Sequence, residues 1–509
     1  MGKLSKALTV LILSALVLAA CSSESGEQSD SGKNHINLLF NFATSSLDPN
    51  VDTSYVSLRA GITETLIHLN DESLKIEPWL AQSWDSEDGQ TWTIQLRDDV
   101  TFQNGNPMDG AAVKASLERA MKDSVAIKNA LRIESIKAEA NTLTIKTEVP
   151  FPEFPSELVH PNTSIIDVTE TDFVNKPIGT GPFAVSSFIP GTAVNLVRYD
   201  GYWDGAALLE TAKFSFNEDA NARSLALQSG DADIVFRPEV ESLDSLKAVE
   251  GIEVESTSTF RVHQMTMNLQ RKPLQDINVR KAIDALIDRK MIAETILKGH
   301  AEVAAGPFPS SFSFAPEYPK KQSGLDIARN FLKEAGYTEA DGVMQKDGKP
   351  LELTLLTYSA RADLPLIAQV FQSDAKQLGI QVTIQQIEIP EEYMAANRDW
   401  DLTTYSNLTA PRGDAGYYLN ATYHPKGALN FSGANDDQLT KMIDQLNSTV
   451  GQQERSDIAE EIASYVDGQV YNSFILHPNT LVAYNSGKVK NWVTSRSEYY
   501  MLTNELDVN

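Results

Sequence analysis

Alternating apolar and polar residues predict several half-buried strands in this chain. Apolar side chains occupy every second position at Trp92, Ile94 and Leu96, and again at Leu143 and Ile145. Other stretches space their apolar residues three or four apart, which is the period of a helix face packed on a core. These faces are Val113, Leu117, Ala120 and Met121; Ile283, Leu286 and Ile287; and Ile458, Ile462 and Tyr465. Because both periods recur along the chain, the sequence predicts an α/β fold.

One segment has the pattern of a complete crossover unit. Leucines alternate at 351–355, a helical period follows at 367–378, Gly379 interrupts it, and residues 380–384 alternate again. Strand, helix, glycine and strand in this order predict two parallel strands joined by a helix. A further helical period at 327–335 also stops at a glycine.

The first 21 residues follow the pattern of an export signal. Lys3 and Lys6 precede an apolar run at 8–20, which is shorter than the roughly 20 residues of a membrane span. Cys21 follows Leu18-Ala19-Ala20 directly. This arrangement resembles a bacterial lipobox, in which the lipidated cysteine becomes the mature N-terminus. A plain cleavable signal with a chance cysteine is the alternative. We expect a lipid anchor at Cys21, followed by a polar, flexible tether.

Charge and cysteine content exclude several classes of protein. The 509 residues include 43 Lys and Arg against 69 Asp and Glu, a net charge of −26. Such acidity argues against a nucleic-acid partner, whose phosphates need a basic face. Because Cys21 is the single cysteine, an internal disulfide framework, a Cys-ligated zinc site, an iron–sulfur cluster and a Cys nucleophile in the folded body are excluded. Hydrophobic residues make up 42% of the chain, enough for two to four domains with cores.

The usual signatures of catalysis are missing from the sequence. It contains no GxSxG, P-loop, HExxH or GxGxxG motif, and its seven histidines include no pair at helical spacing. Gly179-Thr180-Gly181-Pro182 lacks the Lys-Ser/Thr of a phosphate loop and predicts a tight turn into a strand. A pair of carboxylates, as in glycoside hydrolases, stays open beside the alternative of solvated acids. We expect a protein that is not an enzyme.

Several segments, in order along the body, resemble the family 5 extracellular solute-binding proteins of ABC importers, the peptide and nickel class. They are PWLAQSW at 78–84, LRDDVTFQNGNPMDGAAVKASLERA at 96–120, PIGTGPFAVSSF at 177–188, YDGYWDG at 199–205, residues 279–309 and DIARNFLKEAGY at 326–337. Residues 130–160, 357–379 and 400–430 resemble the nickel-binding lipoproteins of Gram-positive importers in particular. Around His160-Pro161-Asn162 the chain lacks the arginine with which Gram-negative nickel binders hold a carboxylate of the chelator.

The resemblance implies a two-lobed, periplasmic-binding-protein-like α/β fold of class II, with mixed sheets, an inserted subdomain and a hinge that closes on the ligand. The implied parts are a signal peptide at 1–20, a tether at 21–34, lobe I at 35–69 with 186–274 and 481–509, an inserted subdomain at 70–185, and lobe II at 275–480.

It also implies the ligand and the partners. Proteins of this subgroup capture nickel as a chelate, usually with histidine, so the protein itself needs no metal ligands or cofactor. The implied partners are a permease and an ATPase, and the implied setting is the outer face of a Gram-positive cell membrane, with the protein as a monomer. A receptor for oligopeptides or dipeptides is the main alternative. An exported hydrolase and a sensor or adhesin without a permease are further ones.

For such a chelate we expect arginines to hold carboxylates and aromatic rings to cover imidazoles. Arg412 is the first candidate, with a surface pair to Asp414 as the alternative. Arg261 is the second, against a structural ion pair, and His263 shares its strand face, so that both lie in the cleft or both in the core. The weaker candidates are Tyr405 and Thr44, each with packing as the alternative, and Arg361, with a solvated charge as the alternative.

Overall fold

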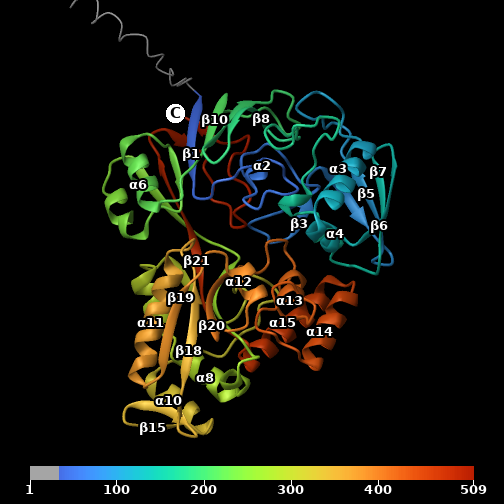
Figure 1. The fold of residues 1–509 in the computed structure, drawn as a ribbon. Helices are drawn as coiled ribbons and strands as arrows, with labels where there is room; N and C mark the ends of the chain where they lie inside the picture. The colour runs from blue at the N-terminus through green and yellow to red at the C-terminus, as the bar shows by residue number, and fades with distance from the viewer. Residues whose placement is uncertain (1–33) are drawn as a thin grey trace, which may run out of the picture.

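The computed structural model describes residues 34–509, which form two lobes with strands running between them (Figure 1). Lobe I, at the top of the view, holds both β1 and the C-terminus, and lobe II lies below it. The predicted signal peptide at 1–20, the predicted lipid anchor at Cys21 and the predicted tether up to residue 33 lie outside the described residues. Within residues 34–509, no helix combines the length and the apolar character that a membrane span requires.

Lobe I is built on a mixed sheet. Its first strand pairs in parallel with two neighbours, β10 and β11, and the sheet continues antiparallel through β9 and β8. Leu227 of helix α6 and Leu243 of helix α7 pack on one face of this sheet. The elements are β1 (His35–Phe40), β8 (Phe183–Ile189), β9 (Ala193–Arg198), β10 (Thr211–Phe216), α6 (Ala220–Ser229), β11 (Ile234–Phe236), α7 (Leu243–Lys247) and β12 (Ile252–Ser258).

A subdomain with its own antiparallel sheet extends from lobe I, on the right of Figure 1. The alternating residues predicted as strands lie in β5 and β7, and the helical face from Val113 lies in α3. Asp109 caps α3 by accepting a hydrogen bond from the backbone N–H of Ala112. The elements are β4 (Ala81–Asp85), β5 (Thr91–Leu96), α3 (Gly110–Asp123), α4 (Val125–Leu131), β6 (Ile133–Glu139), β7 (Thr142–Thr147) and the short helix α5 (Phe154–Glu157).

Lobe II contains the predicted crossover unit. Strands β18 and β19 pair in parallel and are joined by α11, which stops at Gly379 in the left-handed region with φ +69°. Helix α8 includes Ile283 but ends before the predicted Leu286 and Ile287. The main elements are β13 (Arg261–Met267), α8 (Ile277–Ala285), α10 (Leu325–Glu334), β18 (Glu352–Thr357), α11 (Asp363–Gln377), β19 (Gln381–Gln386), α12 (Pro390–Ala396), β20 (Leu402–Leu408), α13 (Gly416–Tyr423), α14 (Asp437–Ser448) and α15 (Gln452–Gln469).

The long strand β21 (Asn472–Asn485) belongs to both lobes. Its first half pairs with β13, and its second half pairs with β11 and β12. The chain crosses between the lobes a second time between β12 and β13, where Thr259 donates a hydrogen bond to the carbonyl of Pro478 at 2.9 Å. Two adjacent crossings of this kind can act as a hinge. The mixed α/β fold expected from the sequence is therefore confirmed.

The domain boundaries themselves stay a prediction, and the strand pairing favours one change to them. Strand β13 lies in the stretch 186–274 that was predicted for lobe I, but it pairs with β20 and with the first half of β21. A boundary near Thr259 would place β13 with the strands that it pairs with.

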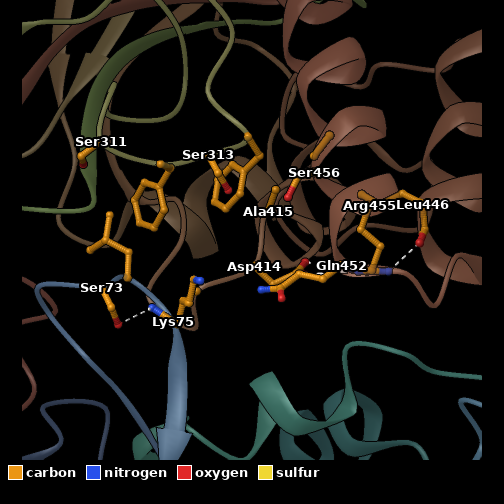
Figure 2. Close-up of a pocket in the computed structure, with 15 residues that line it drawn as sticks. Ser73, Lys75, Ser311, Ser313, Asp414, Ala415, Leu446, Gln452, Arg455 and Ser456 are labelled. Atoms are coloured by element: carbon orange, nitrogen blue, oxygen red, sulfur yellow. Dashed lines mark hydrogen bonds and ion pairs between the residues drawn. The ribbon is translucent and has the colours of Figure 1, made fainter.

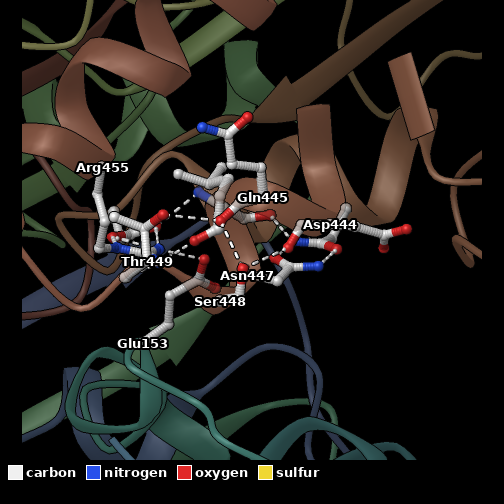
Figure 3. Close-up of polar contacts among 11 residues, drawn as sticks. Glu153, Asp444, Gln445, Asn447, Ser448, Thr449 and Arg455 are labelled. Carbon is white, nitrogen blue, oxygen red and sulfur yellow. Dashed lines mark hydrogen bonds and ion pairs between the residues drawn. The ribbon is translucent and has the colours of Figure 1, made fainter. Parts of the chain in front are cut away.

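Carboxylates at the two ends of α5 meet arginines of lobe II. Glu157 pairs with Arg412, which lies in the loop after β20. Glu153 pairs with Arg455 of α15 (Figure 3). Asp414 accepts two hydrogen bonds from the same guanidinium at 3.0 Å. All of these groups except Asp414 are buried. Charges buried in this way stabilise the contact only while they stay paired, so the two ion pairs hold the subdomain against lobe II.

The pKa of Glu153 couples this contact to pH. Burial, and after it the negative charge of Asp414, raise the pKa of Glu153 to about 7, although Arg455 opposes the shift. The carboxylate of Glu153 thus takes up a proton near neutral pH, which removes its charge from the pair with Arg455.

Glu64 fixes the position of the inserted subdomain on lobe I. Its buried carboxylate accepts hydrogen bonds from four side chains at 2.7–3.1 Å. Two donors lie in the stretch 70–185 and two lie in lobe I. The donors are Trp79, Thr180, Tyr202 and Trp203. The turn at Gly179 also packs closely on lobe I, because a Cβ at this position would lie 2.1 Å from the carbonyl oxygen of Ile62.

We expect Glu64→Ala to lower the free energy of unfolding by about 3–5 kcal/mol, because it leaves four buried donors without an acceptor. Denaturant titration measures this loss. Glu64→Gln is the matched control: it retains one carbonyl oxygen and should lose roughly half as much. A loss below about 1 kcal/mol in the alanine variant would show that water replaces the carboxylate.

Replacing both carboxylates of α5, as Glu153→Ala/Glu157→Ala, should open the ligand-free protein, because lobe II then loses its charged partners across the gap. Small-angle X-ray scattering at pH 7 should report a larger radius of gyration than in the wild type. The control Glu148→Ala/Glu170→Ala removes two exposed acids of the same stretch and should leave the radius unchanged. Equal radii in both variants would contradict the role given to α5.

Candidate ligand site between the lobes

Arginines converge where the chain crosses between the lobes. Arg237 follows β11 in lobe I and pairs with Glu498 at 2.5 Å. Arg261, the first residue of β13, lies 3.5 Å from the other oxygen of the same carboxylate. Thr480 of β21 donates a hydrogen bond to Glu498 at 2.5 Å. One buried carboxylate thus holds two guanidinium groups that come from different lobes.

Arg361 adds a third guanidinium without a partner of its own. It lies just before α11 and is half-buried, and its guanidinium makes no hydrogen bond or ion pair within residues 34–509. Its neighbour Asp363 instead accepts a hydrogen bond from His263, with 2.7 Å between Oδ2 and Nε2. Three arginines (237, 261 and 361) against two carboxylates (363 and 498) leave a charge of +1. A surplus cation in a protein of net charge −26 predicts an anionic ligand.

The pKa shifts of these groups describe the same imbalance. Burial, and then the charges of Arg237 and Arg261, hold the pKa of Arg361 well below its usual value. For Glu498, burial favours the neutral acid, but the arginines outweigh it and keep the pKa far below the usual range. Because a guanidinium does not lose its proton in proteins, the strain on Arg361 is relieved by an anion and not by deprotonation.

Tyrosines from both lobes form an aromatic wall beside these charges. The guanidinium of Arg412 lies 4.2 Å from the ring centroid of Tyr417, the second residue of α13. The ring of Tyr55 in lobe I meets that of Tyr499 edge to face at 5.9 Å, and Arg59 lies 5.5 Å above Tyr55. Such rings can cover a flat aromatic ligand, and the adjacent guanidinium groups can hold its carboxylates.

His160 belongs to the same wall. Its ring lies edge to face against Tyr55 at 5.5 Å between centroids. Its Nδ1 accepts a hydrogen bond from the backbone N–H of Asn162 at 3.2 Å and so caps a short 3-10 turn. Burial, and then the positive charge of Arg412, hold the pKa of His160 well below 6.5. The ring is therefore neutral at physiological pH.

A network of turns holds Tyr55 in place. Thr44 donates a hydrogen bond to Asp52 at 2.9 Å, and Asp52 accepts backbone N–H groups of Ser54 and Val56. Tyr55 itself adopts a left-handed conformation with φ 52°, which is uncommon for an aromatic residue and needs such support. Thr44 thus meets the site only through the loop that carries Tyr55.

The structure separates the alternatives for the predicted residues, although their roles in binding stay predictions. Arg412 pairs across the lobes with Glu157, and Asp414 pairs with Arg455 instead. The predicted surface pair of Arg412 with Asp414 is therefore not the one formed.

Four predicted residues lie in or next to strands of lobe II, and they differ in how directly they contact the site. They are Arg261, His263, Tyr405 and Arg361. Arg261 is held in an ion pair but adjoins Arg361. His263 is buried against Asp363. Tyr405 donates a hydrogen bond to Glu391 at 2.6 Å and packs against Tyr358 and Phe431, so it supports the site from the core side.

Sequence reasoning missed most of the lobe I contribution and Tyr417 of lobe II. The residues it did not single out are Tyr55, Arg59, Arg237, Tyr417, Glu498 and Tyr499. Most of them lie in loops or at the ends of strands, where no period marks a functional side chain. Two adjacent tyrosine pairs, Tyr417-Tyr418 and Tyr499-Tyr500, were the visible signals in the sequence.

A separate cavity lies next to this site. It has a volume of about 140 Å³ and is lined from the turn at Ser73–Lys75 on one side and from α15 on the other (Figure 2). Phe312 and Phe314 line it as well. None of the arginines and tyrosines of the wall lines it, although Gly413 and Asp414 follow Arg412 directly. The charged site and this cavity are thus neighbours across one loop.

The described residues contain no group of three or more His, Cys, Asp or Glu side chains arranged to hold a metal ion. The arginines and rings suit a ligand with carboxylates and flat faces. If such a ligand carried a metal, the ligand itself would supply the donor atoms.

Two solved structures resemble this chain over almost its whole length. The chain is 64% identical to the crystal structure of a nickel ABC transporter from Bacillus halodurans, with 93% of this chain and 100% of that chain covered and a TM-score of 0.81. A crystal structure of NikA from Staphylococcus aureus in complex with Ni(L-His)2 is 33% identical, with 94% and 100% covered and a TM-score of 0.82.

Two further findings concern sequence alone. The nickel-binding protein NikA of Staphylococcus aureus is 34% identical over 498 residues, which is 98% of both chains. The profile of the bacterial extracellular solute-binding proteins, family 5, matches residues 75–430. The chain therefore belongs to the family 5 extracellular solute-binding proteins.

Proposed function

We propose that this protein is the substrate-binding lipoprotein of an ABC importer and that it captures nickel as a chelate, with histidine as the chelator. The observation that carries the proposal is Arg361, a half-buried guanidinium without a partner that faces two other arginines between the lobes. The relatives named above as nickel-binding proteins support the choice of metal.

Histidine as chelator accounts for the composition of the site. Two histidine molecules can satisfy nickel with imidazole and amine nitrogens and still present carboxylates and flat rings. Arg361 and its neighbours then hold carboxylates, and Tyr55, Tyr417 and Tyr499 cover rings. The relative crystallised with Ni(L-His)2 supports this reading.

The remaining parts of the proposal concern the setting. Lipidation at Cys21 would tether the body to the outer face of the cell membrane, since the described helices offer no membrane span. A permease and an ATPase would receive the chelate from the closed form, and the protein would act as a monomer that performs no catalysis. The Gram-positive host is inferred from the resemblance of the sequence to binding lipoproteins of such bacteria.

Calorimetry with the purified body tests the ligand. We expect heat with nickel and histidine together, and none with nickel alone or histidine alone, because the intact chelate supplies both the charge and the rings. A pool of di- to pentapeptides without metal is the matched control. Heat from the peptides and none from the mixture would replace the proposal with a peptide receptor.

Replacing Arg361 with alanine should weaken binding of the nickel–histidine chelate by about 1.5–3 kcal/mol, roughly a 10- to 150-fold rise in Kd. The same change should leave the thermal unfolding of the ligand-free protein unchanged or raise it, because it removes a cation that faces Arg237 and Arg261. Calorimetry and thermal melts measure the two effects.

The control for this prediction is Arg198→Ala, which removes a positive charge on the surface of lobe I where Arg198 pairs with Asp200. Arg198→Ala should change neither the Kd for nickel–histidine nor the melting temperature. If Arg361→Ala lowers the melting temperature and leaves Kd unchanged, Arg361 is a structural residue.

A further inference from the structure

The hydrogen bond at Nδ1 of His160 fixes which nitrogen of the ring carries the proton. A backbone N–H can only donate, so Nδ1, which lies 3.2 Å from the amide nitrogen of Asn162, presents its lone pair. A neutral imidazole has one proton, which must then reside on Nε2.

The surroundings keep the ring neutral. Among the described residues, the charged group that acts on it is Arg412, which lowers the pKa of His160 further than burial alone. Glu157 is the nearest acid along the chain, and it is bound to Arg412. Tyr55 contacts the ring through its edge and brings no charge at neutral pH. A second proton therefore has no counter-charge to stabilise it.

The N–H at Nε2 has no acceptor within residues 34–509, and the half-buried ring leaves this atom open to solvent. An N–H donor next to a guanidinium and a ring edge suits an anionic oxygen. We propose that His160 contacts the ligand as a hydrogen-bond donor from Nε2 to a carboxylate oxygen of the chelator and does not bind the metal.

This inference rests on the proposed function for the identity of the ligand, but it adds a selection rule. A metal needs a lone pair, and in this tautomer the single lone pair of the ring faces a backbone amide. His160 therefore selects a chelate with a free carboxylate edge. The chelator alone coordinates the metal. Because His160 makes no bond to the metal, the site can release the chelate intact.

Two variants test the two ring nitrogens of His160 separately. His160→Asn retains an oxygen at the position of Nδ1, which caps Asn162, but removes the donor at Nε2. His160→Gln places an amide N–H near the position of Nε2 and loses the cap. We expect His160→Asn to raise the Kd for nickel–histidine about tenfold or more and His160→Gln to stay within about threefold of the wild type.

Nitrogen NMR of protein labelled at its histidines tests the tautomer without any ligand. Comparison of the wild type with His160→Asn assigns the signals. We expect a protonated Nε2, an unprotonated Nδ1 and no titration between about pH 5.5 and pH 8. A proton on Nδ1, or titration in this range, would overturn the inference whether or not nickel–histidine binds.

Nickel-edge X-ray absorption of the loaded protein tests the exclusion of the metal. The nitrogen coordination should be the same in the wild type and in His160→Gln. Loss of an imidazole ligand in the variant would make His160 a metal ligand, and equal Kd values for His160→Asn and the wild type would remove it from the site. If the wild type fails to bind nickel–histidine, the proposed function fails, while the NMR result still decides the state of the ring.

Discussion

The ligand site depends on an imbalance of charge at the crossing between the lobes. Glu498 neutralises part of a cluster of arginines, and Arg361 remains without a partner. A desolvated cation costs free energy unless an anion joins it, so the empty closed site is the less favourable state of this region. An anionic ligand removes that cost, and its binding and the closing of the lobes then support each other.

The ion pairs at α5 have the opposite effect on the contact between the lobes. Arg412 and Arg455 reach carboxylates of the inserted subdomain. The paired charges at α5 thus favour the contact between the lobes, and the unpaired charge of Arg361 opposes it. The apparent affinity for the ligand reflects the balance between these two effects, because a ligand binds more weakly when the closed, binding-competent state is sparsely populated. A protein tuned in this way can close firmly on a chelate and still release it.

Local patterns predicted the fold better than the site. The crossover from β18 through α11 to β19 follows from leucine alternation, a helical period and Gly379, all within 40 residues of sequence. Arg412 and Arg261 were found because they lie at the ends of strands. Glu498 and Arg237 could not be found in this way, because they are 261 residues apart in sequence and meet only after β11 and β21 pair. Arg361 was visible, but its lack of a partner is a property of the folded chain alone.

The same reasoning explains how a chain without clustered metal ligands can serve a metal. Among the described residues no metal-holding cluster exists, and His160 in the aromatic wall presents an N–H without a partner there. Donors of this kind recognise the outer edge of a complex and leave its inner coordination unchanged. Capture and release then require no ligand exchange at the metal. A receptor built on guanidinium groups, rings and a neutral imidazole thus matches a cargo that arrives with its coordination already complete.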